Sequence, residues 1–196
     1  MTSPFSVHLK LHKSMTKKIY LKKFLLYFFI VVYAALLTKI ILFKEVVSPS
    51  DIFSTSREIK RSIDLIPFKS TYDFFTNPES SFGLAAWNVL GNILLFIPLG
   101  IFLRMYKKTE KFWKYIAAIF TVSLTFEVLQ YILGVGRTDI DDLIYNTIGG
   151  ILGVFIYKAL FKILRGEERA KTSIIIFAVI FSGILLYILS TIKVRL

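Results

Sequence analysis

The sequence predicts an all-α fold: a polytopic membrane helix bundle of about five transmembrane helices, with the N-terminus cytoplasmic and the C-terminus external. Three observations predict it. The chain of 196 residues is 55% hydrophobic, with a mean hydropathy of +0.65, above the usual composition of a soluble domain. Its apolar residues gather in five long runs, and its basic residues concentrate in alternate connections between those runs.

Each apolar run is close to the ~20 residues that a helix needs to cross a bilayer. The runs occupy residues 24–43, 84–103, 112–133, 143–164 and 173–192. Backbone polar groups inside lipid must be paired within the segment, so the runs should be helices. We divide the chain into a basic cytoplasmic tail (1–23), a membrane core (24–164) and an additional transmembrane helix (165–196). The first run suits an uncleaved signal anchor better than a cleaved signal peptide, since its apolar stretch exceeds the usual h-region.

The distribution of lysine and arginine predicts the orientation. Sixteen basic residues lie in the tail, in the connections after the second and fourth runs and in the turns of the runs that adjoin those connections, against eight on the other side. Cytoplasmic connections carry the excess of positive charge, which places the tail inside and the long connection 44–83 outside. The same distribution, which flanks apolar runs, argues against nucleic acid as a partner despite the net charge of +12.

Composition also limits the chemistry. The chain has no cysteine, and its two histidines, His8 and His12, lie in the tail. Thiolate metal sites, disulfides and a Ser-His-Asp triad within the bilayer are therefore excluded. We predict no cofactor and no resident metal.

Polar residues inside the runs are costly and need an explanation. Three runs each carry them on one helical face, in the half that the orientation places outside. The candidate binding residues are Asn88, Asn92, Glu127, Gln130, Arg137, Asp139, Asp141, Asp142 and Asn146. For the asparagines and for Gly149, Gly150 and Gly153, helix–helix packing is an alternative explanation. A buried carboxylate at Glu127 needs a partner, and Arg137 is the natural candidate.

The external connection contains the aromatic residues Phe68, Tyr72, Phe74, Phe75 and Phe82. Aromatic side chains anchor segments at the membrane interface. Two interpretations stay open: an interfacial loop, with a short amphipathic helix, or a lid over a site that faces outward.

Four stretches resemble the VanZ-like family of bacterial membrane proteins: 65–68 (LIPF), 88–100 (NVLGNILLFIPLG), 127–130 (EVLQ) and 136–146 (GRTDIDDLIYN), the last running on to the glycines. The resemblance covers roughly 24–161 and leaves the fifth run outside. It implies a multi-pass protein of the bacterial plasma membrane. The family name implies low-level resistance to the glycopeptide teicoplanin.

We weigh two functions. In the first, the protein is not an enzyme, and its outer polar cluster binds a lipid-linked cell-wall precursor or a lipoglycopeptide among the membrane lipids. In the second, it is an enzyme acting on a lipid or cell-wall precursor, with Glu127, Asp139 and Asp142 as acid and base or as oxygen ligands of a divalent cation. A transporter is less consistent, since no inverted repeat is visible.

Overall fold

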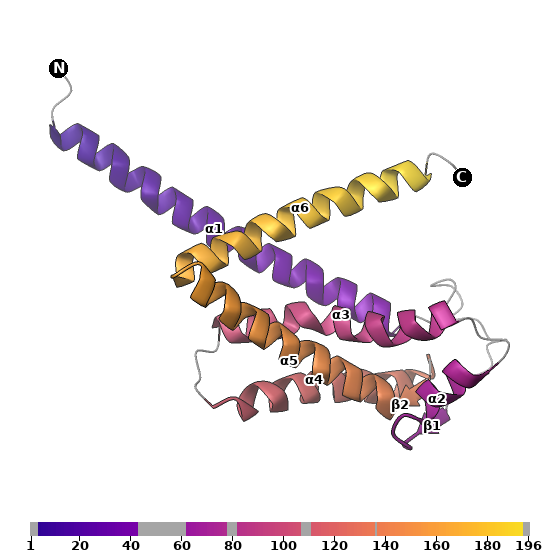
Figure 1. The fold of residues 1–196 in the computed structure, drawn as a ribbon. Coiled ribbons are helices and arrows are strands. Elements are labelled where there is room, and N and C mark those ends of the chain that lie inside the picture. Colours follow the sequence, from indigo (N-terminus) through magenta and orange to yellow (C-terminus); the bar gives the residue numbers. More distant parts are fainter. Residues whose placement is uncertain (1–3, 43–61, 78–81, 107–110, 136, 194–196) are drawn as a thin grey trace. The chain divides into compact units, whose positions relative to one another are not determined.

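The structure is a computed structural model that describes residues 4–42, 62–77, 82–106, 111–135 and 137–193, with side chains described from residue 20 to residue 180 apart from a few positions (Figure 1). The described residues are mostly helical, as predicted. The elements in chain order are α1 (Pro4–Leu42), β1 (Ser62–Asp64), α2 (Lys69–Thr76), α3 (Phe82–Tyr106), α4 (Trp113–Leu133), β2 (Arg137–Asp139), α5 (Ile140–Ile163) and α6 (Glu167–Lys193).

Four stretches within these helices are long and apolar enough to cross a membrane, and they correspond to the first four predicted runs. They are Tyr20–Leu42, Ala86–Tyr106, Trp113–Leu133 and Ile140–Ile163. The described part of the chain thus has four candidate spans where we predicted five. The fifth predicted run, 173–192, falls in α6, whose side chains lie outside the description beyond residue 180.

The chain divides into two compact units, which we describe separately. One unit combines residues 1–34 with 161–196, and the other comprises residues 35–160. In the first, the ammonium of Lys22 donates a hydrogen bond to the hydroxyl of Thr172 at 2.9 Å, and Lys171 pairs with Glu167 at 2.7 Å. The second unit contains every predicted site residue.

Helices α3 and α5 run parallel and approach each other through glycines. A Cβ added to Gly149 would collide with the backbone carbonyl of Ile93, and one added to Gly153 would collide with that of Ile97. Membrane helices use such small residues to bring their backbones together. The packing interpretation of these glycines is therefore confirmed, and the contact aligns the start of α5 with the first half of α3.

Among the described residues, a parallel pair of short strands is regular structure that the all-α prediction missed. Ser62 of β1 pairs with Arg137 of β2, and Asp64 pairs with Asp139. Parallel strands need a long crossover connection, and here that connection contains α2, α3 and α4. The pairing places the predicted external connection directly beside the start of α5.

Candidate functional site

The site gathers buried polar side chains from α3, α4, β2 and α5. Eight of them are at most 8% exposed: Asn92, Ser123, Glu127, Gln130, Asp139, Asp141, Asp142 and Asn146. Seven of these belong to the nine residues that the sequence predicted. We call the end of the 35–160 unit at which they lie, together with β1, β2 and α2, the polar end (Figure 1).

Glu127 connects α4 to the strand that follows it. Its Oε2 atom accepts a hydrogen bond from the backbone N–H of Asp139 at 3.0 Å, and its backbone carbonyl accepts one from the hydroxyl of Thr138 at 3.1 Å. The chain reaches that strand because Gly134 ends α4 in the left-handed conformation, with φ of 59°, as helix C-termini commonly do. The side chain of Arg137, the predicted partner of Glu127, lies outside the described residues.

Asp139 begins α5. Its Oδ1 atom accepts a hydrogen bond from the backbone N–H of Asp141 at 2.9 Å, which is the geometry of an N-terminal cap. One helical turn later, Asp142 accepts a hydrogen bond from the side-chain amide of Asn92 on α3. The first turn of α5 is thus fixed by its own cap and by α3.

Two further amides join the remaining helices. The Nδ2 atom of Asn146 donates to the hydroxyl oxygen of Ser123 on α4 at 3.0 Å. The Nε2 atom of Gln130 donates to the backbone carbonyl of Ile41 at 3.0 Å, in the last turn of α1, where carbonyls have no partner within the helix. At the polar end, therefore, α1 and α4 end while α3 and α5 begin.

Asp141 holds α2 against α5. Its carboxylate accepts hydrogen bonds from the backbone N–H of Phe68, from the backbone N–H of Thr71 at 2.9 Å and from the hydroxyl of Thr71 at 2.7 Å. The residue that precedes α2, Phe68, has a left-handed backbone with φ of 63° and supplies no side-chain cap. Asp141 thus supplies from another helix the negative charge that favours a helix N-terminus.

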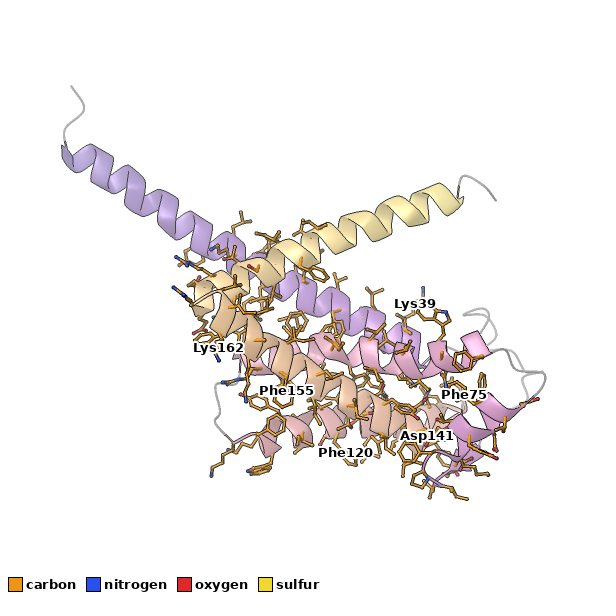
Figure 2. The ribbon with its side chains drawn as sticks, viewed as in Figure 1. Lys39, Phe75, Phe120, Asp141, Phe155 and Lys162 are labelled. Atoms are coloured by element: carbon orange, nitrogen blue, oxygen red, sulfur yellow. The ribbon has the colours of Figure 1, made fainter. Side chains whose placement is uncertain are left out.

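Sequence reasoning missed the residues on the α2 side of this contact. Thr71 lies 3.0 Å from the hydroxyl of Tyr145, and the rings of Phe68 and Tyr145 are 6.5 Å apart. Figure 2 shows Asp141 at the start of α5 beside α2, which carries Phe75. No spacing rule connects residues 68–71 to residue 141, so the sequence alone carried no signal for their pairing.

Two buried amide oxygens have no hydrogen-bond partner among the described residues: Oδ1 of Asn146 and Oε1 of Gln130. Each side-chain amide donates a hydrogen bond to another residue, while its oxygen accepts none from the described residues. Gln130 and Ser123, the partner of Asn146, lie about one helical turn on either side of Glu127 on α4. The interior of the polar end therefore presents hydrogen-bond acceptors on both sides of Glu127.

Asn88, another of the predicted residues, does not join this arrangement. Asn88 is exposed on α3, although it lies four residues from the buried Asn92. Among the described residues, no three histidine, aspartate or glutamate side chains come close enough to hold a metal ion together. The acids of the polar end are spread between separate contacts with backbone N–H groups and amides.

Comparison with known proteins agrees with the resemblance noted above. Residues 28–164 match the family model described as VanZ/LLP1. A curated relative, Protein VanZ of Enterococcus faecium, is 33% identical over 139 residues, which cover 71% of this chain and 75% of that protein. No solved structure matches the chain significantly. The chain, a multi-span membrane protein, therefore belongs to the VanZ/LLP1 family.

Proposed function

We propose that this protein lies in the bacterial plasma membrane with its polar end outside, where it binds an envelope or lipid-linked ligand and thereby contributes to teicoplanin resistance. The link to teicoplanin comes from the family resemblance. The ligand would present hydrogen-bond donors, as the amide and hydroxyl groups of cell-wall precursors and lipoglycopeptides do. Its donors would meet the buried acceptors beside Glu127.

The two unpartnered amide oxygens carry this proposal. Polar residues that serve only to join helices tend to have both their donors and acceptors paired, because an unpaired polar group costs free energy in a low-dielectric interior. Asn146 and Gln130 are 1% and 0% exposed, yet each has an acceptor without a partner in the described part of the chain. A ligand that donates hydrogen bonds would remove that cost.

The outward orientation is supported by the excess of basic residues at the opposite ends of the helices. The alternation of helix ends at the polar end agrees with a chain that crosses the bilayer back and forth. With α6 as a fifth span, the C-terminus would also lie outside. A reporter enzyme that works only outside the cytoplasm should be active when it is fused to the C-terminus. Activity of a fused reporter that works only inside the cytoplasm would overturn the five-span arrangement.

The binding test uses a susceptible bacterial host that produces the chain. Host cells with the wild-type chain should tolerate more teicoplanin than cells without it, and Asn146→Ala and Glu127→Gln should remove that protection at equal membrane levels. Asn88→Ala is the matched control, since Asn88 is exposed, and it should keep the protection. Unchanged protection in Asn146→Ala, Glu127→Gln and Asp142→Asn would refute a function of the polar end.

The same variants address the enzymatic alternative. If Glu127, Asp139 and Asp142 act as acid and base, purified wild-type protein should convert a lipid-linked cell-wall precursor into a product detectable by mass spectrometry. If the protein only binds, the precursor should be recovered unchanged while Asn146→Ala weakens its retention. Turnover that depends on Glu127 would replace the binding proposal.

A further inference from the structure

The segment that Asp141 holds exposes a large amount of apolar surface. Between residues 63 and 75, seven large apolar side chains are 40–67% exposed: Ile63, Leu65, Ile66, Phe68, Tyr72, Phe74 and Phe75. Large exposed apolar side chains gathered in one short segment, among polar residues, are typical of a contact with another molecule or with a membrane.

Two aromatic residues of helix α2, Tyr72 and Phe75, are three residues apart and share one face of the helix. Together with the exposed ring of Phe68, which precedes the helix, they form what we call the aromatic face. Lys69 and Asp73, which are four residues apart, lie on a neighbouring face and form the polar face. Both faces are exposed, so the described part of the protein covers neither of them.

Two attachments fix the aromatic face relative to the start of α5. Asp141 holds its first turn through Phe68 and Thr71, and the pairing of Asp64 with Asp139 holds the residues just before it. Such a doubly attached segment keeps a fixed place relative to the start of α5.

The aromatic face is also continuous with the surface of a membrane span. The ring of Phe75 lies 5.3 Å from that of Phe82 at the start of α3. Phe82 is itself 76% exposed, and Trp87 one turn further is 69% exposed. Trp87 lies within the candidate span of α3, Ala86–Tyr106, and Phe82 lies just before it, so both exposed side chains are near the end at which this helix would enter the bilayer.

We propose that α2 lies along the membrane surface, with its aromatic face in the boundary between lipid head groups and acyl chains and its polar face toward water. Amphipathic helices bind membranes in this way. The partner is the bilayer itself, because the face continues the lipid-facing surface of α3. That the leaflet is the outer one rests on the orientation given under the proposed function.

The chain has no cysteine, so single spin labels can report the depth of each face. Tyr72→Cys and Phe75→Cys test the aromatic face in liposomes, and Asp73→Cys is the matched control on the polar face. Labels on the aromatic face should collide more with oxygen than with a water-soluble nickel chelate, and the label on the polar face should show the reverse. Equal access of the chelate to both faces would overturn the proposal and indicate a soluble partner.

Two further measurements separate the parts of the inference. A membrane-impermeant maleimide should label Asp73→Cys in intact cells. If it does not, while the depth result holds, the orientation fails and the lipid contact stands. Asp141→Asn and the milder Thr71→Val should both increase the mobility of a label at residue 72. Unchanged mobility in both would refute the role of Asp141 in holding α2.

Discussion

Residues 141–146 of α5 bind other elements through carboxylates that accept hydrogen bonds and an amide that donates one, whereas residues 149–153 contact α3 through glycines. In the first segment, Asp141 reaches α2, Asp142 reaches α3 and Asn146 reaches α4. In the second, the backbones of α3 and α5 touch because Gly149 and Gly153 have no side chain. One helix therefore uses two kinds of contact in consecutive turns.

The difference shows how tasks are divided in a membrane helix. Lipid provides no hydrophobic drive for helices to associate, so close packing and interhelical hydrogen bonds do so. The glycine segment brings the helices together, and the polar segment fixes which groups lie opposite each other. Changes to the two segments should therefore differ in kind: loss of the bundle in one case, and local release of an element in the other.

The largest effect is expected from Gly149→Ala. The added methyl group would collide with the backbone carbonyl of Ile93, which cannot move aside as a flexible side chain could. Overpacked sites usually cost about 1–3 kcal/mol. We expect Gly149→Ala to lower the free energy of unfolding by the upper end of that range or more. Denaturant titration of the purified protein in detergent, followed by circular dichroism, would measure it.

Gly91→Ala is the matched control for that comparison. A Cβ at Gly91 has nothing within 4 Å, and alanine is favoured over glycine within a helix by about 0.5–1 kcal/mol. Gly91→Ala should leave stability unchanged or raise it slightly. Equal losses in the two variants would show that the contact between α3 and α5 is not what Gly149 provides.

An intermediate and local effect is expected from Asp141→Asn. An amide cannot accept from all three donors that the carboxylate binds at Phe68 and Thr71, and hydrogen bonds to charged groups contribute about 1.5–3 kcal/mol. Hydrogen exchange should become faster at residues 68–76 and remain unchanged in α3–α5.

Thr71→Val is a milder variant that removes only one of these three hydrogen bonds. It removes the hydroxyl that donates to Asp141 at 2.7 Å and leaves the backbone N–H in place, so it should cost less than Asp141→Asn, and at most about 1.5–3 kcal/mol, the contribution of a single hydrogen bond to a charged group. Faster exchange that spreads through α5 in either variant would contradict a local role for Asp141.

The smallest effect is expected where two polar side chains only pair with each other across helices. A double-mutant cycle with Ser123→Ala and Asn146→Ala would isolate the bond between Asn146 and Ser123. Interhelical hydrogen bonds in membranes average about 0.6 kcal/mol in such cycles, and we expect a coupling of that size. A coupling several times larger would mean that these residues stabilise the bundle as strongly as the glycines do.

The sequence was a good guide to features that depend on local pattern. Apolar length located four spans, and the predicted run 112–133 differs from α4 (Trp113–Leu133) by a single residue at its start. Spacing along one helix also placed Glu127 and Gln130 on one face, which is buried, because helical periodicity is a local property.

Features that depend on distant contacts were not predictable. Strands β1 and β2 have three residues each, too few for an alternating pattern to show. The i, i+4 rule placed Asn88 beside Asn92, yet Asn88 is exposed. Four residues turn a helix by about 40° beyond a full turn, so two such residues can lie on either side of the edge of a buried face.

The contact between Phe68 and Asp141 joins residues 73 positions apart, and that separation has a consequence for biosynthesis. At about 5–20 residues per second, the ribosome adds Asp141 about 4–15 s after Phe68. During that interval the aromatic residues of α2 have already been made, but the carboxylate that holds them does not yet exist. A nascent chain arrested before β2 would therefore carry α2 unattached, and protease access to residues 63–76 in a series of arrested chains should fall once residue 141 has emerged.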